Sequence, residues 1–170
     1  GLGWLMIFLA IGLGGCATVN FDYPKSENTV FEDTDDSLLG RHAAPRAAAH
    51  PPGESGFILQ VDGVDALATR ILLARWAEHS IDAQYYLITA DVIGYLFIEA
   101  LLDAADRGVR VRFLLDDIMI SGYDLGLAAL DSHPNIELCI FNPIARGGWR
   151  TWNLLTDFSR INRRMHNKTC

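Results

Sequence analysis

The sequence predicts an α/β fold in which helices flank a sheet that is at least partly parallel. Two observations support this prediction. Short runs of branched and aromatic residues alternate along the chain with longer stretches of helical periodicity. Two capping residues, Asp91 and Gly108, mark the ends of an apolar helix that lies between two such runs. Strand–helix–strand units of this kind build parallel sheets, whose ligands bind at the carboxyl ends of the strands.

The predicted sheet domain spans residues 56–170. Between 62 and 79 apolar side chains recur at helical spacing, which indicates an amphipathic helix. The run 81–88 is rich in aromatic and branched residues, which indicates a strand. In chain order the elements are an extended run or strand over 57–59, a helix over 62–79, strand 81–88, helix 92–107, strand 109–115, a short helix over 123–130, strand 136–141, helix 149–160 and a strand from 165.

The later strands follow from local signals. Residues 109–115 alternate at first and are then fully apolar, as expected of a strand that enters a core. A turn at 133–135 precedes the strand over 136–141, where Cys139 is most simply a buried thiol. Pro143 ends that strand.

The N-terminal region reads as a targeting segment. Residues 2–13 are apolar or glycine, too few for a confident membrane-spanning helix, and they fit the apolar part of a signal peptide. The run ends in Leu13-Gly14-Gly15-Cys16, which resembles a bacterial lipoprotein box. Residues 1–16 are therefore predicted to be a lipoprotein signal with Cys16 as the lipidated residue, or else a signal anchor with an incidental cysteine. The predicted location is the bacterial envelope, on the outer membrane or on the periplasmic face of the inner membrane.

Residues 17–55 are predicted to form a flexible linker. They carry Asp and Glu, then Ala, Pro and His, without a persistent apolar period. Such a composition buries too little apolar surface to offset the entropy of ordering. His42 and His50 are interpreted as solvated linker residues rather than metal ligands.

Charge and motifs narrow the function. The net charge of -7 argues against a general nucleic-acid binder, while the basic residues between 146 and 168 suit an anionic substrate. The same basic residues also fit a solvated surface helix. The three cysteines make no disulfide framework, and neither a glycine-rich nucleotide loop nor a convincing metal cluster is evident, so no cofactor and no metal is predicted.

The chemically most informative stretch is His166-Asn167-Lys168. In a strand, alternate side chains share a face, so His166 and Lys168 point the same way and Asn167 points the other way. An imidazole beside a fixed ammonium suits attack on phosphorus. By spacing alone, a solvated basic strand end is the favoured interpretation of the stretch. Candidate contacts for the substrate phosphate are Arg163, Arg164 and Asn142, while Asp116 and Asp117 either hydrogen-bond near the site or cap a turn.

Several stretches together resemble the phospholipase D superfamily, and within it the bacterial cardiolipin synthase C-like proteins. They appear in the family's order, and they are 80–87, 104–112, 114–117, 133–137, 141–143, 157–158 and 162–168. The superfamily signature is His, any residue, Lys, four residues and then Asp. His166 and Lys168 match it, while the Asp would fall three residues beyond Cys170. The resemblance implies that the chain is the first of two similar halves, and that this piece alone is inactive.

The resemblance also implies a mechanism and its partners. His166 would form a phosphohistidine, Lys168 would stabilise the phosphoryl oxygens, and a histidine of the second half would act as acid and base. The implied reaction passes a phosphatidyl group to the glycerol of phosphatidylglycerol, from a phosphatidylglycerol or phosphatidylethanolamine donor at a membrane. The alternatives are a phospholipase D-type phosphodiesterase or nuclease, and a non-catalytic scaffold tethered to the envelope.

Overall fold

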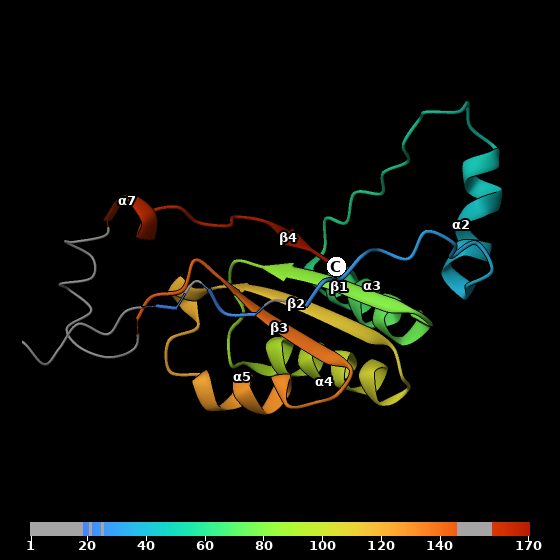
Figure 1. Ribbon diagram of the computed structural model, residues 1–170. Coiled ribbons are helices and arrows are strands. Elements are labelled where there is room, and N and C mark those ends of the chain that lie inside the picture. The colour runs from blue at the N-terminus through green and yellow to red at the C-terminus, as the bar shows by residue number, and fades with distance from the viewer. Residues whose placement is uncertain (1–18, 21, 25, 146–157) are drawn as a thin grey trace, which may run out of the picture.

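The computed structural model describes residues 19–20, 22–24, 26–145 and 158–170 (Figure 1). Cys16 and most of the helix predicted over 149–160 lie outside these residues. The described elements are α2 (Leu38–Ala48), α3 (Gly63–Trp76), β1 (Ser80–Tyr85), α4 (Val92–Asp106), β2 (Arg110–Asp116), the 3-10 helix η1 (Asp117–Met119), α5 (Asp124–Asp131), β3 (Ile136–Phe141), α7 (Phe158–Ile161) and β4 (Lys168–Thr169).

The sheet has the strand order β3-β2-β1-β4. β1 pairs with β2 and β2 pairs with β3 in parallel, and β4 pairs with β1 in the antiparallel direction. The antiparallel register places Thr169 opposite Gln84 and Lys168 opposite Tyr85. The predicted α/β fold with a mixed sheet is confirmed. Both parallel pairs are joined through a helix, as the crossover connection between parallel strands requires.

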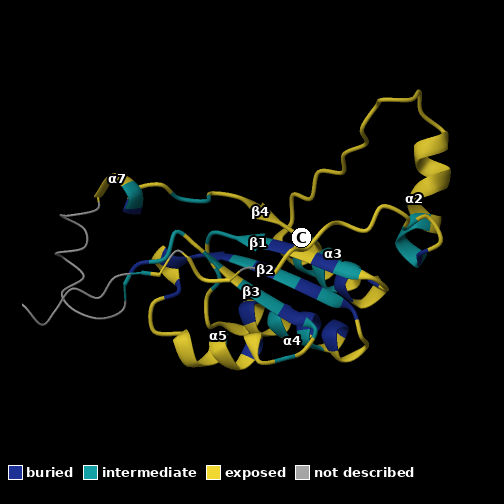
Figure 2. Cartoon of the chain, in the orientation of Figure 1, coloured by how far each residue is buried: buried dark blue, intermediate teal, exposed yellow. Residues whose placement is uncertain are grey.

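The core lies between the sheet and the helices drawn beneath it (Figures 1 and 2). Alternate residues of β1 and β2 face these helices and are buried, and α4 contributes Phe97 and Leu101 from the other side. Phe97 contacts Tyr85 and Phe113, with ring centroids 5.1 Å and 6.3 Å away. The predicted caps of α4 are confirmed: the Asp91 side chain accepts a hydrogen bond from the Gly94 amide at 2.8 Å, and Gly108 adopts a φ of 92° just past the helix.

The opposite face of the sheet is polar and is crossed by residues 26–31, at the blue end of the chain (Figure 1). Ser26 and Asn28 donate hydrogen bonds to the Glu137 carboxylate on β3. Arg110 of β2 donates to the Thr29 carbonyl at 2.8 Å, and its guanidinium lies 4.4 Å from the centre of the Phe31 ring. The chain is therefore tied to the sheet before α2 begins.

Cys139 lies on this polar face and is exposed, so the prediction of a buried thiol is wrong. Its neighbours Leu138 and Ile140 pack against the core instead. Because side chains alternate along β3, burying these two turns Cys139 away from the helices.

Part of the predicted flexible linker is ordered, so that prediction is wrong for 26–31 and for α2. Ser37 caps α2 by accepting a hydrogen bond from the Gly40 amide at 3.0 Å. The Leu38 amide donates to Glu78 at 2.6 Å, and the His42 ring stacks on Trp76 with centroids 5.9 Å apart. These partners lie beyond the linker, so the composition of the linker alone does not reveal them.

Two further predictions are corrected at the element level. Residues 57–59 form no strand, and Phe57 is 92% exposed, so the strand alternative for this run is wrong. The strand predicted from 165 is limited to Lys168–Thr169. No helix among the described residues is long and apolar enough to cross a membrane.

The Asp82–Arg112 pair on the polar face makes stability depend on pH. A bidentate hydrogen bond from Arg112 holds the pKa of Asp82 below its ordinary value, against an opposing effect of partial burial. A carboxyl whose pKa is depressed by folding stabilises the protein above the unfolded pKa of about 3.9, and that contribution is lost as pH falls through the folded pKa.

We therefore expect Asp82→Asn to lower the free energy of unfolding at pH 7 by about 1 kcal/mol, a value discounted for solvent screening. This loss of stability should vanish as the pH falls below the pKa of Asp82 in the folded protein. Urea titrations at several pH values measure it. Asp103→Asn on the exposed side of α4 is the matched control. A deficit that is the same in acid and at neutral pH would contradict the assignment.

Candidate active site

His166 and Lys168 meet at one aromatic ring, that of Tyr86, directly after β1. The His166 ring centroid lies 4.8 Å from that of Tyr86, with an interplanar angle of 50°. The Lys168 Nζ lies 5.6 Å from the same centroid. Asn167 points elsewhere, and its Nδ2 donates to the Gln84 Oε1 at 3.0 Å. The imidazole and the ammonium therefore share one side of the segment, as strand alternation predicts, and both side chains are exposed to a reactant.

Tyr86 limits how these two groups move. An aromatic face attracts a cation held within about 6 Å, and a tilted ring contact restricts rotation of the imidazole. The sequence indicates only that Tyr86 belongs to the strand predicted over 81–88. Its role depends on the antiparallel register of β1 and β4, which local periodicity does not encode.

The segment that leads to His166 is anchored by Asp116 at the carboxyl end of β2. The Asp116 side chain has no exposed surface. Its Oδ1 accepts hydrogen bonds from Arg164 Nη1 and from the Ile118 amide, both at 3.0 Å. Its Oδ2 accepts from the Met165 amide at 3.0 Å. Both readings of Asp116 therefore apply, because it caps η1 and also positions the two residues before His166.

A second anchor lies at the carboxyl end of β3. Asn142 has a φ of 50°, and its Nδ2 donates to the carbonyls of Arg160 and Arg163 at 2.6 Å and 2.7 Å. Its Oδ1 accepts from Arg160 Nη1 at 2.8 Å. Both ends of the Asn142 amide hold the turn that precedes His166, and its predicted contact with phosphate stays a prediction.

Neighbouring Asp117 is also buried, and its carboxylate accepts a hydrogen bond from the Ile144 amide. Asp117 therefore fixes the chain that follows β3. It belongs to the framework of the site rather than to its reactive surface.

The two arginines predicted to bind phosphate differ in their surroundings. Arg163 is exposed, so its guanidinium is accessible to an anion. The Arg164 side chain is 12% exposed and is paired with Asp116. Its Nε and Nη2 are buried and have no hydrogen-bond partner within the described part of the chain. A phosphate contact of either arginine stays a prediction.

Within residues 19–145 and 158–170, apart from positions 21 and 25, no group of three or more His, Cys, Asp or Glu side chains is placed to hold a metal ion. The reactive groups that the described residues do bring together are an imidazole and an ammonium. With the partly buried ring of Tyr86 and an anchored approach segment, they form a candidate site for phosphoryl transfer through nitrogen.

Comparisons with known proteins agree with this class. The chain is 50% identical over 131 residues to "Cardiolipin synthase C" of Escherichia coli, across 77% of this chain and 28% of that protein. It is 37% identical over 166 residues to an uncharacterized protein of Helicobacter pylori, across 96% of this chain and 33% of that protein. The solved structure "NucT from Helicobacter pylori" matches with a TM-score of 0.42 and 24% identity, over 50% of this chain and 52% of that one. No family model matches.

The chain thus spans about a third or less of the length of these two curated relatives. The similarity places it in the phospholipase D superfamily, among sequences like those of the cardiolipin synthases, as the motifs predict.

Removing the Asp116 charge should weaken the anchoring of the segment that leads to His166. Asp116→Asn leaves Arg164 as a buried cation without a counter-charge, which typically destabilises a protein by about 3–5 kcal/mol. We expect a loss of this size in urea unfolding, whereas Asp103→Asn should stay within about 0.5 kcal/mol of the parent. Adding Arg164→Met to Asp116→Asn should recover part of the loss. A single variant as stable as the parent would show that the pair does not anchor the segment.

Proposed function

We propose that this chain supplies the nucleophile of a phosphodiester-transfer site, in an enzyme that passes a phosphatidyl group from one phospholipid to the glycerol of another. The observation that carries the proposal is the placement of His166 and Lys168 on the single ring of Tyr86. The 50% identity to cardiolipin synthase C supports this choice of reaction.

The chemistry follows from the two side chains. An imidazole nitrogen of His166 forms a bond to the phosphorus, and the bond from phosphorus to the leaving alcohol breaks. The leaving oxygen takes a proton from an acid, for which the resemblance supplies a histidine outside the described residues. The acceptor hydroxyl then attacks the phosphohistidine, gives up its proton to the same histidine and releases His166. The Lys168 ammonium favours the charge that develops on the phosphoryl oxygens in both steps.

The charges of the site favour an anionic lipid headgroup. Arg160, Arg163, Arg164 and Lys168 lie within the described residues 158–170, which contain no Asp or Glu, while the chain as a whole carries -7. Local positive charge on an acidic protein attracts a small anionic headgroup and repels a long polyanion. A lipid on Cys16 would hold the enzyme at the envelope membrane that contains such headgroups.

The catalytic assignment predicts a large and specific loss of product. The complete gene product, expressed in bacteria that lack cardiolipin synthases, should make cardiolipin. His166→Ala should lower its formation by about a thousandfold or more, and Lys168→Ala by about a hundredfold, because a nucleophile and a charge-stabilising group are removed. Lipid extracts analysed by mass spectrometry measure both.

The exposed His50 provides the control, since His50→Ala should leave the yield unchanged. Retained turnover in His166→Ala would exclude this residue as the nucleophile. A folded, membrane-located parent protein that makes no cardiolipin would refute the transferase. Purified protein offered DNA and phospholipid vesicles separates the remaining alternatives: cleaved DNA indicates a nuclease, and inertness toward both indicates a scaffold.

A further inference from the structure

A pocket of about 200 Å³ lies between α3, the end of β1 and the start of α4. Arg70 of α3 and Tyr85 of β1 supply its polar surface, together with Thr89 and Asp91. Its apolar walls are formed by Leu67, Leu87, Ile88, Ile93 and Phe97. A cation set in a largely apolar pocket matches a ligand that carries both an anion and hydrocarbon.

Arg70 is half-buried, and its guanidinium can bind such a ligand. Its Nη1 donates to the Ala66 carbonyl at 2.9 Å, and no carboxylate within the described ranges forms an ion pair with it. Burial raises the pKa of the Tyr85 phenol, and the nearby Arg70 charge opposes that rise. A guanidinium that lacks a counter-ion in a partly apolar site binds phosphate strongly, because it can donate two parallel hydrogen bonds to the phosphate oxygens.

The acidic residue of the pocket does not neutralise Arg70. The Asp91 carboxylate accepts hydrogen bonds from the Thr89 hydroxyl at 2.6 Å and from the Gly94 amide at 2.8 Å. These bonds, that of Thr89 first, lower the pKa of Asp91. Its charge therefore caps the positive end of α4.

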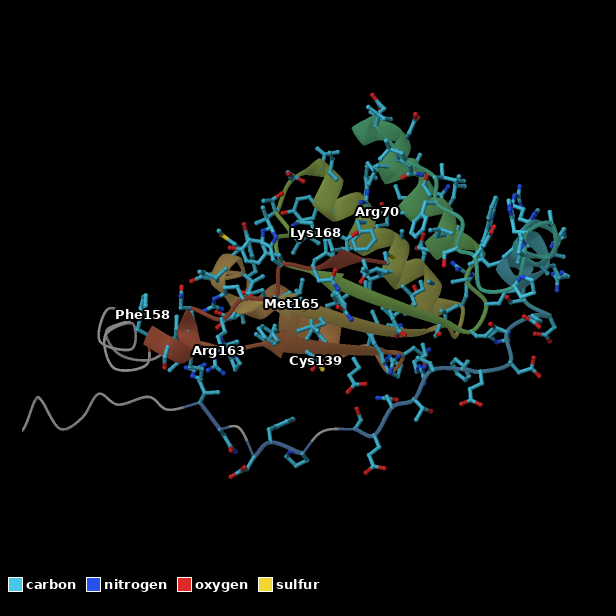
Figure 3. The ribbon with its side chains drawn as sticks, turned by 90° about the horizontal axis from the view of Figure 1, so that it is seen from above. Arg70, Cys139, Phe158, Arg163, Met165 and Lys168 are labelled. Carbon is cyan, nitrogen blue, oxygen red and sulfur yellow. The ribbon has the colours of Figure 1, made fainter. Side chains whose placement is uncertain are left out.

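The pocket and the reactive pair lie on consecutive residues of the same strand end. Tyr85, beside Arg70, packs toward the helices against Phe97. Tyr86, the next residue, carries His166 and Lys168. In the sheet, Lys168 lies directly opposite Tyr85, and Figure 3 shows Arg70 and Lys168 near the same end of β1. Two cationic positions thus flank one strand end, and each suits a separate phosphate.

We infer that the Arg70 pocket binds the phosphate of the acceptor phospholipid, while His166 and Lys168 engage the donor phosphorus. This inference rests on the proposed function, because only transfer between two phospholipids requires two phosphate positions. The apolar walls hold the acylglycerol part of the acceptor, and its headgroup hydroxyl is directed toward the phosphohistidine. Hydrolysis needs no second lipid phosphate, so Arg70 distinguishes transfer from hydrolysis.

The decisive measurement is the partition between two products. The complete gene product is supplied with phosphatidylglycerol in mixed micelles, and cardiolipin and phosphatidic acid are both quantified. Arg70→Gln should lower the ratio of cardiolipin to phosphatidic acid about tenfold, as expected for the loss of one charged hydrogen-bonding group, with total donor consumption nearly unchanged. Arg70→Lys, which keeps the charge but not the fork, should fall in between.

The control is Arg75→Gln, at an exposed position in the last turn of the same helix, which should leave the ratio unchanged. An unaltered ratio in Arg70→Gln overturns the inference. A parallel fall of both products also overturns it, because it would indicate a donor site or a structural effect. Circular dichroism establishes that the variants are folded.

A binding experiment tests the pocket apart from turnover. In the inactive His166→Ala background, calorimetric titration with dihexanoylphosphatidylglycerol should show about tenfold weaker binding when Arg70→Gln is added. Dihexanoylglycerol, which has no phosphate, should not compete. Equal binding with and without Arg70, or displacement by inorganic phosphate as effective as that by the lipid, overturns a lipid-phosphate site. If the parent protein transfers nothing, the proposed function fails while this titration still judges the pocket.

Discussion

Asp116, a carboxylate with no exposed surface at the end of β2, accepts hydrogen bonds from the Arg164 guanidinium and from the amides of Ile118 and Met165. A buried charge is tolerated only when it is paired and hydrogen-bonded, and these donors meet that condition. The pairing of β4 with β1 spans only Lys168–Thr169. Two residues of strand cannot define an approach by themselves, so the position of His166 depends on this carboxylate.

The parallel sheet explains why the residues of the site lie at one edge. The parallel strands deliver Tyr86, Asp116 and Asn142 to their carboxyl ends, where β1, β2 and β3 stop. Each has a different task there. Tyr86 contacts the reactive side chains, whereas Asp116 and Asn142 bind the backbone that leads to them. In the proposed site the pair of His166 and Lys168 is exposed, and its position is set by buried polar groups behind it.

The sequence was informative wherever local signals and the final contacts agree. The alternation of strands and helices, the Asp91 cap and the Gly108 turn are short-range features, and the structure confirms them. Contacts that join distant segments escaped prediction. The helix α2 is held by Glu78 and Trp76, which no property of the linker announces. In the same way, the sequence did not predict the hydrogen bonds from Asn142 to the carbonyls of Arg160 and Arg163, because these partners lie in another segment.

The segment over 26–31 has a consequence for how the chain reaches this state. The contact from Asn28 to Glu137 joins residues that are 109 positions apart. Closing so long a loop costs conformational entropy. The contact that offsets this cost can form only when β3 already lies beside β2 and presents Glu137. We therefore expect the segment over 26–31 to assemble after the sheet and to detach first when the domain unfolds. The contacts of residues 26–31 should be among the last of the described tertiary contacts to form, and until then the polar face with its exposed Cys139 stays open to other molecules.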